Sequence, residues 1–286
     1  MQTILFADDA CLTFAHESSH QIELFVNIEL GKVNKWMEVN KLSLNTAKTN
    51  FVIFHRKRQT IDISLVYKER ALERKSFIKY LGILVDEKLN FSEHIKFCTK
   101  KLVNCLWAIS KLRKYTSCET LKLVYYAMAY PFLQYCISTW GGTCKSLLQP
   151  LFRKQKIIVR TILNKPFRSH STPLFYDLNL LKLEDIYKLQ IGKMMRKGCG
   201  NDNSVTPNNR QAESLIALSN IHTHNTRSRL KENFYLPHVR TNLGKTSFSF
   251  NGPKIWNSLP VEIRASPNFT FPAVLKTYLI EKYAST

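Results

Sequence analysis

The amino-acid sequence predicts an α+β fold in which a mixed N-terminal part precedes a helical part and a small mixed C-terminal part. Three observations support this prediction. The 286 residues are 44% hydrophobic and 22% charged, which is enough apolar material for folded cores. Up to about residue 90, short runs of β-forming residues alternate with turns, and beyond it the apolar residues follow the helical period. A polar, turn-rich stretch at 198–207 then marks a linker before the last part.

The N-terminal part is expected to combine hairpins, short strands and one helix. Residues 3–14 place two apolar, β-forming runs on either side of Asp8 and Asp9, so both aspartates are expected at the tip of a hairpin. From Ser19 to Asn40, apolar residues recur at helical spacing, which predicts an amphipathic helix that packs on a sheet. Further strands are expected at 51–54, 61–67 and 77–85.

The middle part is expected to be helical. Ser92 and Ser117 belong to a residue type that commonly caps helix N-termini, so we predict helices that start there and run to about Lys114 and Trp140. A glycine pair directly after Trp140 is expected to end the second helix. Two more helices are expected at 146–164 and 184–197, with Gly198 ending the last.

The C-terminal part is expected to be mixed. The alternation of Ser and Phe from Ser247 to Phe250 predicts a short strand. A helix is expected from about Pro272 to Tyr283, because apolar residues recur there at helical spacing.

Positive charge is concentrated in the middle part. The formal net charge is +21, and residues 93–170 hold 14 lysines and arginines against 2 glutamates. Aromatic residues are interleaved with these cations. Cations that follow a phosphate backbone and flat rings that stack on bases are typical of nucleic-acid binding. A helical bundle with an aromatic core and a solvated lysine surface would explain the same pattern, so both interpretations remain open for each single aromatic residue.

The cysteines and the hydropathy indicate an intracellular protein without a membrane span. The seven cysteines are scattered with no Cys-x-x-Cys pair, which fits neither a disulfide framework nor a zinc ribbon. No stretch approaches the ~18 consecutive apolar residues of a membrane helix. The first 20 residues contain acidic side chains and lack the basic start of a signal peptide.

The acidic pair is the candidate metal site. Two adjacent carboxylates disfavour each other's ionisation unless a cation neutralises them, so a divalent metal is the natural partner of Asp8 and Asp9. An exposed turn can also contain such a pair without any function. The order of the motifs gives the pair more weight: Phe6-Ala7-Asp8-Asp9 is followed by the Trp36 to Thr49 segment and then by Tyr80-Leu81-Gly82.

This order of motifs resembles the reverse transcriptases of non-LTR retrotransposons, the LINE-like transposable elements, and most closely the jockey-like group. Residues Gly252 to Pro260, together with Arg227 and Gly244, are similar to the tail that follows the polymerase in these elements. The resemblance implies that residues 1–90 are the C-terminal part of a polymerase palm, 91–200 a helical thumb and connection, and 201–286 a C-terminal tail domain.

The resemblance also implies the roles of the candidate residues in an RNA-directed DNA polymerase, a nucleotidyltransferase. Two Mg²⁺ or Mn²⁺ ions would act on an RNA template, a DNA primer and deoxynucleotides, with Asp8 and Asp9 as metal ligands and catalytic residues. Lys48, the third catalytic candidate, would lie near the incoming nucleotide and stabilise the leaving pyrophosphate. Primer contacts are implied for Tyr80, Leu81 and Gly82. The expected contacts to duplex phosphates are Lys96, Lys100, Lys101, Lys111, Arg113, Lys114 and Lys122.

The sequence departs from the family pattern at its start. In the family, the fingers and the first palm aspartate precede the acidic hairpin, whereas this sequence begins five residues before Phe6. We therefore expect a fragment that binds nucleic acid but does not polymerise alone, with a nuclear working site implied by the family. The alternative is a non-catalytic, basic nucleic-acid-binding protein or the product of a decayed pseudogene.

Overall fold

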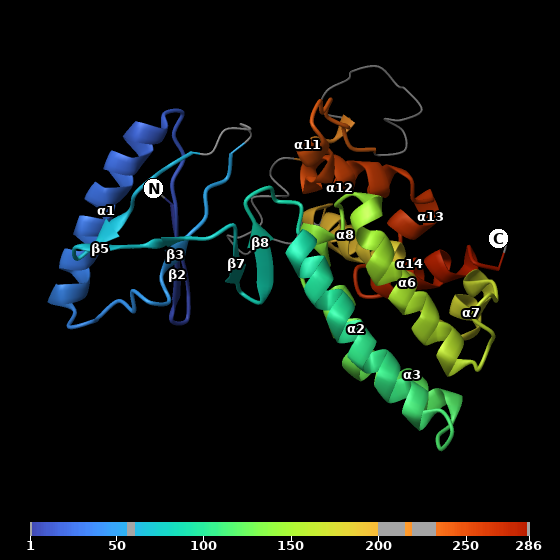
Figure 1. The fold of residues 1–286 in the computed structure, drawn as a ribbon. Helices are drawn as coiled ribbons and strands as arrows, with labels where there is room; N and C mark the ends of the chain where they lie inside the picture. Colours follow the sequence, from blue (N-terminus) through green and yellow to red (C-terminus); the bar gives the residue numbers. More distant parts are fainter. Residues whose placement is uncertain (1, 56–60, 200–214, 219–232, 285–286) are drawn as a thin grey trace. The chain divides into compact units, whose positions relative to one another are not determined.

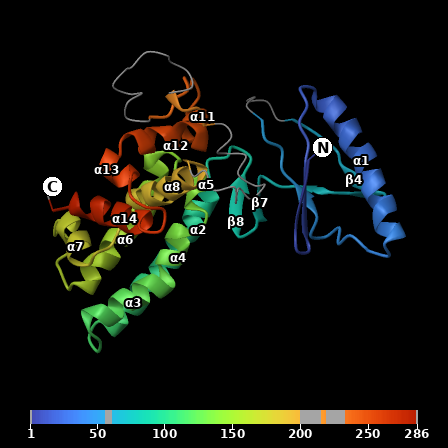
Figure 2. The same cartoon turned by 180° about the vertical axis from the view of Figure 1, so that it is seen from behind.

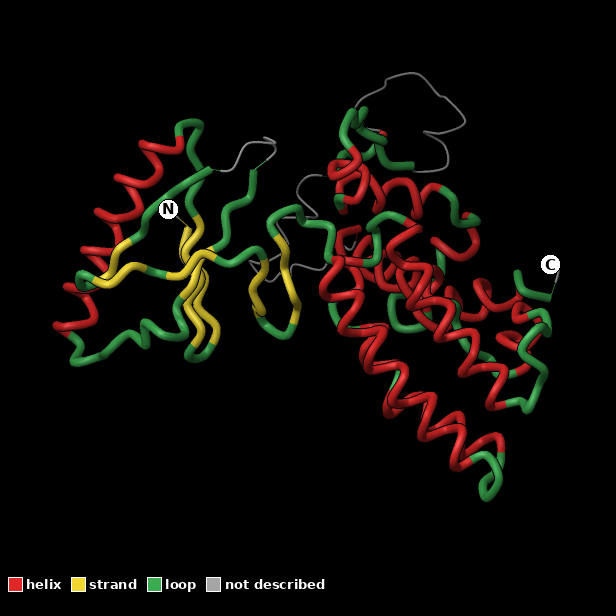
Figure 3. The backbone as a smooth tube through the Cα atoms, in the orientation of Figure 1, coloured by secondary structure: helices red, strands yellow, loops and turns green. Residues whose placement is uncertain are grey.

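The computed structural model describes residues 2–55, 61–199, 215–218 and 233–284. The chain divides into two compact units, Met1–Leu89 and Asn90–Thr286 (Figure 1). The named strands all lie in the first unit, and most helices lie in the second (Figure 3). The general α+β class is therefore confirmed. In the described part of the chain, no helix is long and apolar enough to cross a bilayer.

The first unit begins with a β-hairpin of β1 (Gln2–Phe6) and β2 (Asp9–Thr13), in which Phe6 pairs with Asp9. The two loop residues are Ala7 and Asp8, and Ala7 has a φ of 52°, in the left-handed region. The prediction that both aspartates lie at the tip is wrong for Asp9, because a two-residue loop leaves it as the first residue of β2.

Helix α1 (Ser19–Val39) packs its apolar face on the β4 segment. Its buried residues Val26 and Leu30 form a core cluster with Leu65 and Tyr67. The Asn27 amide joins the helix to the neighbouring strand, because Asn27 Nδ2 donates to the Ser64 carbonyl at 3.1 Å and Asn27 Oδ1 accepts from Val66 N at 2.9 Å.

The remaining strands of the first unit are short. β3 (Asn50–Phe51) pairs in parallel with β6 (Glu73–Arg74), while β4 (Val66–Tyr67) and β5 (Arg70–Ala71) form an antiparallel hairpin. The strands predicted at 51–54 and 61–67 are therefore much shorter than expected.

A last hairpin replaces the single strand that was predicted at 77–85. It consists of β7 (Phe77–Tyr80) and β8 (Ile83–Asp86), with Leu81 and Gly82 as its loop. Both loop residues have a positive φ, 44° and 84°, which is the backbone that a tight two-residue hairpin turn requires. The apolar run therefore folds back on itself at Gly82.

The second unit is built around two long helices that pack along each other, α2 (Ser92–Leu112) and α6 (Lys145–Ile162). Between them in the sequence come three shorter helices, α3 (Cys118–Met128), α4 (Tyr130–Gln134) and α5 (Ile137–Trp140). The single helix predicted up to Trp140 is wrong. The chain breaks before Pro131, which lacks a backbone donor, and again at Cys136, which has a φ of 48°.

Two of the predicted helix ends are confirmed and two are wrong. Ser117 caps α3, since its side chain accepts from Thr120 N, and Gly141 is the C-cap of α5. Ser92 is not a cap: it is the first residue of α2, and the N-cap is Phe91, whose φ is 59°. Gly198 does not end its helix either, because α8 (Leu183–Cys199) includes it.

The buried Gln155 amide organises the core of the second unit. Its Nε2 donates to Tyr125 Oη at 3.0 Å and to the Leu181 carbonyl at 2.9 Å. Its Oε1 accepts from Leu183 N at 3.0 Å. These three bonds satisfy a fully buried amide and join α6 to α3 and to the start of α8.

The C-terminal helices pack on α8 within the same compact unit (Figures 1 and 2). After α7 (Ser171–Asp177) and α8, the described elements are α11 (Asn242–Thr246), α12 (Phe248–Asn257), α13 (Val261–Arg264) and α14 (Phe271–Glu281). The strand predicted at Ser247–Phe250 is wrong, because these residues start α12. The predicted linker at 198–207 lies mostly outside the described residues.

Close packing against α8 leaves no room for side chains at two glycines. A Cβ at Gly252 of α12 would lie 2.7 Å from Met195 Sδ. A Cβ at Gly192 of α8 would lie 2.6 Å from Leu275 Cδ2 of α14. Both glycines therefore allow the C-terminal helices to approach α8 closely.

Candidate nucleic-acid site

The acidic hairpin and the last hairpin of the first unit approach each other at Tyr80. The Cys11 side chain and the Asp9 carboxylate both lie near enough to the Tyr80 hydroxyl to act on its pKa. The pKa of Tyr80 is raised above its ordinary value of 10.0, first by burial and then by electrostatic interaction with Cys11 and Asp9. The structure thus brings together one predicted metal ligand and the first residue of the predicted primer contact.

The carboxylates of Asp8 and Asp9 are both exposed. Among the described residues, no group of three or more His, Cys, Asp or Glu side chains could hold a metal ion. Two divalent ions carry a charge of +4, which two carboxylates neutralise only in part. The described donors therefore do not fit a two-ion centre.

The backbone around Lys48 is fixed by the Asn45 side chain and carbonyl. Lys48 N donates to the Asn45 carbonyl at 3.1 Å and to Asn45 Oδ1 at 3.2 Å, and Thr49 Oγ1 donates to the same carbonyl at 2.9 Å. The turn fixes the backbone at Lys48 and leaves its side chain exposed. In the described part of the chain, the Lys48 ammonium forms no ion pair with Asp8 or Asp9.

Helix α2 presents one basic, aromatic face, which we call the α2 face. It consists of Lys96, Lys100, Trp107 and Lys111, which recur at helical spacing and point to one side, and of Lys114 in the turn directly after the helix. The Trp107 side chain is 67% exposed, and Lys111 Nζ lies 5.9 Å from the centre of its ring. A flat, exposed indole with cations beside it suits a polyanion that carries bases.

The predicted phosphate contacts are not equally available. Lys96 forms an ion pair with Glu93 at 2.6 Å. Lys101 is half-buried over the rings of Phe97 and Phe132, 5.4 and 5.8 Å from their centres. Arg113 is exposed just beyond α2.

Lys122 of α3 lies near Lys276 of α14, which the sequence did not single out. Burial lowers the pKa of Lys276 first, and the positive charge of Lys122 lowers it further. Two lysines near each other strengthen the positive electrostatic potential around α3 and α14. No signal in the sequence could place them together, because 154 positions separate them.

Several aromatic residues of the middle part belong to the core. Tyr125 and Trp140 are fully buried, and burial raises the pKa of Tyr125. For these two residues the interpretation as an aromatic core is correct, whereas Trp107 and Tyr115 are exposed.

Comparison with known proteins adds the family context. The sequence is 26% identical over 184 residues to the probable RNA-directed DNA polymerase from transposon X-element of Drosophila melanogaster, a match that covers 63% of this chain and 20% of the relative. It is 27% identical over 191 residues to the RNA-directed DNA polymerase from mobile element jockey of the same species, which covers 65% and 20%. The chain is similar to non-LTR retrotransposon reverse transcriptases. The resemblance predicted from the motifs is thereby confirmed.

A third relative also comes from a retrotransposable element. The retrovirus-related Pol polyprotein from type-1 retrotransposable element R1 2 of Nasonia vitripennis is 24% identical over 215 residues, with 67% of this chain and 51% of the relative covered. The chain spans about a fifth of the length of the X-element and jockey relatives. No family model and no solved structure match the chain.

The residues that resemble the tail of these retrotransposon polymerases have packing roles in the structure. Trp256 is buried between Phe234 and Phe271, with ring centres 6.4 and 5.8 Å away. Arg196 of α8 donates to the Arg264 and Ser266 carbonyls, both at 2.7 Å. Arg227 lies outside the described residues. The tail-like segment therefore holds the C-terminal helices on α8.

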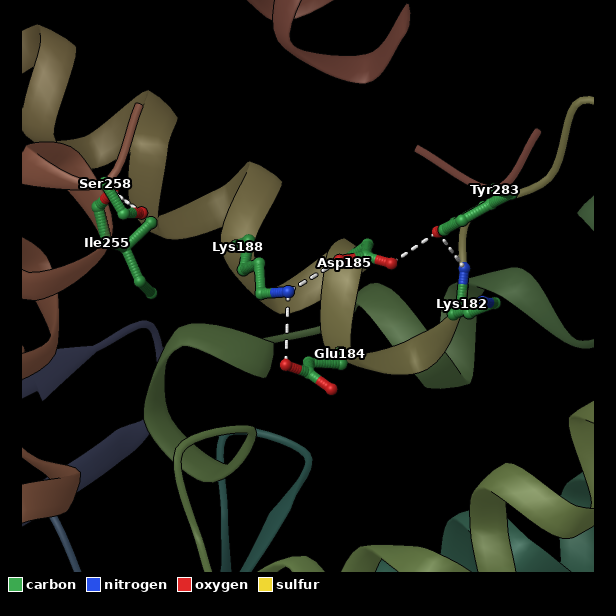
Figure 4. A network of polar contacts seen from close by, with 7 residues as sticks. All are labelled: Lys182, Glu184, Asp185, Lys188, Ile255, Ser258 and Tyr283. Carbon is green, nitrogen blue, oxygen red and sulfur yellow. Dashed lines mark hydrogen bonds and ion pairs between the residues drawn. The ribbon is translucent and has the colours of Figure 1, made fainter. Parts of the chain in front are cut away.

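A polar network ties the end of the chain to the start of α8 (Figure 4). The Tyr283 hydroxyl donates to Asp185 and accepts from Lys182 N at 3.1 Å. Lys188 Nζ lies 2.9 Å from Asp185 and 3.1 Å from Glu184. The buried Asp185 carboxylate is thus paired on both sides, which makes the network a structural one.

Proposed function

We propose that this chain is part of an RNA-directed DNA polymerase of a non-LTR retrotransposon and that it binds template-primer nucleic acid. In this proposal, residues 1–90 belong to the palm, 91–200 to the thumb and connection, and 201–286 to the tail. The RNA template, the DNA primer and the deoxynucleotides are the substrates of the complete enzyme, which works in the nucleus. The similarity to retrotransposon polymerases supports the assignment of the class.

The observation that carries the binding proposal is the α2 face. Lys96, Lys100, Lys111 and the exposed indole lie on one side of a 21-residue helix, Lys114 follows in the next turn, and residues 93–170 have a net charge of +12. A helix of this length spans about 30 Å at 1.5 Å per residue, so its cations can contact several successive phosphates of a duplex.

We propose further that the isolated chain does not polymerise. Asp8 and Asp9 would contribute to binding of Mg²⁺ or Mn²⁺ in the complete enzyme, Lys48 would approach the nucleotide, and Tyr80 to Gly82 would contact the primer. The pair of exposed carboxylates does not complete a two-ion centre among the described residues. Further ligands would have to come from another part of a longer polymerase.

Binding is tested with a fluorescent RNA/DNA hybrid and two variants of equal charge change. The first is the triple variant Lys100→Gln, Lys111→Gln and Lys114→Gln, which removes three cations from the α2 face. Its matched control carries Lys→Gln at positions 32, 35 and 41, all exposed or half-exposed in the first unit. We expect the first variant to weaken hybrid binding at least tenfold and the control to change it less than twofold. Equal weakening by the two variants would reject the α2 face as the binding surface.

Catalysis is tested separately by primer extension on the same hybrid with Mg²⁺ or Mn²⁺. We expect no incorporation at protein concentrations that saturate binding. Incorporation that Asp8→Ala abolishes, with binding unchanged, would show that the chain completes its metal centre and would overturn this part of the proposal.

A non-catalytic nucleic-acid-binding protein is the second candidate. It is favoured by the location of the α2 face in the second compact unit, whereas Asp8 and Asp9 belong to the first. Under this function, Asp8→Ala and Asp9→Ala change neither binding nor any associated activity.

A further inference from the structure

The loop after α6 presents an aromatic ring to solvent in a strongly basic stretch. Phe167 is 74% exposed, and its neighbours Lys165 and Arg168 are exposed as well. The sequence contains no Asp or Glu from position 120 to 176. An exposed flat ring between two exposed cations suits a ligand that is both flat and anionic.

The loop that carries Phe167 is held in a fixed conformation. Asn164 adopts a left-handed φ of 51°, and Lys165 N donates to the Arg160 carbonyl at 2.9 Å, which together end α6 in a Schellman motif. Ser169 N donates to the Pro166 carbonyl at 3.0 Å and closes a turn around Phe167. Little conformational entropy would therefore be lost when a ligand binds to the ring.

The Arg160 side chain also binds this loop to α6. Its Nε donates to the Ser169 carbonyl at 2.9 Å, and its guanidinium carbon lies 5.8 Å from the centre of the Phe167 ring. The ring and the cation are thus positioned together before any ligand arrives. This pairing of an aromatic face with an arginine is the combination that stacks on nucleic-acid bases.

The cations continue along α6 away from the loop. Phe152, Lys156 and Arg160 recur every four residues and so lie on one side of the helix, with Lys156 Nζ 4.4 Å from the Phe152 ring centre. Lys182 lies close to Lys156: burial lowers the pKa of Lys182 first, Asp185 opposes this, and the charge of Lys156 lowers it further. We call Lys156, Arg160, Lys165, Phe167 and Arg168 the α6 track.

We propose that the α6 track binds single-stranded nucleic acid, with one base stacked on Phe167 and the flanking cations on adjacent phosphates. This site contains none of the residues of the α2 face and goes beyond the duplex binding proposed above. Single strands are favoured because the bases of a duplex are already stacked on one another and offer no free face to a side chain.

The test compares a fluorescent 12-nucleotide oligouridine RNA with a blunt 12-base-pair RNA/DNA hybrid on the full chain. Phe167→Ala is expected to weaken oligouridine binding roughly tenfold and to change hybrid binding less than twofold. Phe167→Trp should preserve oligouridine binding because it keeps a stacking surface. Phe269→Ala removes a phenylalanine that is 84% exposed elsewhere in the second unit and should leave both affinities unchanged.

The outcomes separate this site from the α2 face. Loss of oligouridine binding in Phe167→Ala with hybrid binding intact supports the α6 track, even if the α2 variant fails to affect the hybrid. Unchanged oligouridine binding, or equal losses for oligouridine and hybrid, would overturn it. An equal loss in Phe269→Ala would also overturn it, since the effect would then follow exposed phenylalanine in general.

Discussion

The side chain of Tyr80 lies close enough to Asp9 for the aspartate charge to raise the pKa of the phenol. These residues are 71 positions apart and belong to different hairpins, β1–β2 and β7–β8. Their proximity means that the predicted metal ligand and the predicted primer contact share one region of the first unit.

Replacing Asp9 should therefore change the titration of Tyr80. Asp9→Asn removes a negative charge that disfavours the phenolate, so the pKa of Tyr80 should fall towards its ordinary value. The measurement is an NMR titration of ring-labelled tyrosine, with Tyr80→Phe to assign the signal. Asp62→Asn is the control of equal charge change. A Tyr80 pKa that is the same in Asp9→Asn and in the wild type would show that the hairpins do not meet.

Two glycine substitutions should have opposite effects on stability. At Gly141 an added Cβ would lie 2.6 Å from the Ile137 carbonyl oxygen and 2.7 Å from Tyr187 Cδ2, so Gly141→Ala should destabilise the second unit by about 1–3 kcal/mol. At Gly31, inside α1, nothing lies within 4 Å, so Gly31→Ala should stabilise the first unit by up to about 1 kcal/mol. Calorimetry of the full chain measures both. Equal shifts in the same direction would contradict the packing described at Gly141.

Buried thiols should make the second unit less stable in alkali. Burial raises the pKa of Cys105 from 9.0 to about 11, so the folded state keeps a proton that the unfolded chain releases. This contribution to stability is fully present below pH 9 and is lost as the pH rises through 11. Urea denaturation between pH 8 and pH 10.5 should show a free energy of unfolding that falls with pH.

In Cys105→Ala the free energy of unfolding should fall less steeply with pH, by a slope that corresponds to at most one proton released on unfolding. Cys118→Ala, at an exposed position, should leave the slope unchanged. An identical slope in Cys105→Ala and the wild type would show that this thiol is accessible to water in the folded state.

The hydroxyl of Tyr283 should contribute measurably to the stability of the second unit. Tyr283→Phe removes its donation to the buried Asp185 and its acceptance from Lys182 N, which should cost about 1–3 kcal/mol. Tyr278→Phe in α14 is the control, because it also removes one tyrosine hydroxyl. It keeps the ring, whose centre lies 4.2 Å from Lys282 Nζ. Chemical denaturation measures the free energy of unfolding and the m-value of each variant. Equal stability of the two variants would mean that the network in Figure 4 contributes nothing.

Helices with a continuous apolar period could be predicted from the sequence. The prediction for α1 is confirmed within one residue at its C-terminus, and α6 starts one residue before the predicted position. The break before Pro131 has a signal in the sequence, because proline lacks a backbone donor, whereas the left-handed φ of Cys136 leaves no mark there.

The errors in the C-terminal part come from tertiary packing. Alternating Ser and Phe at 247–250 favours a strand locally, but Phe248 starts a helix that places Gly252 against Met195. Contact with α8 therefore decides the structure of these residues over their local pattern. The candidate cations of α2 could be found from their spacing and charge. The meeting of Asp9 with Tyr80 depends on two hairpin turns with left-handed residues and could not.

The central claim is that the α2 face binds template-primer nucleic acid through its phosphates. The most direct measurement is the dissociation constant of an RNA/DNA hybrid at five salt concentrations, for the wild type and for the Lys100, Lys111 and Lys114→Gln variant. Each lost phosphate contact should lower the slope of log affinity against log salt by about 0.9, so the variant slope should be shallower by about 2 to 3. Parallel lines for the two proteins, or binding that does not depend on salt, would contradict the claim.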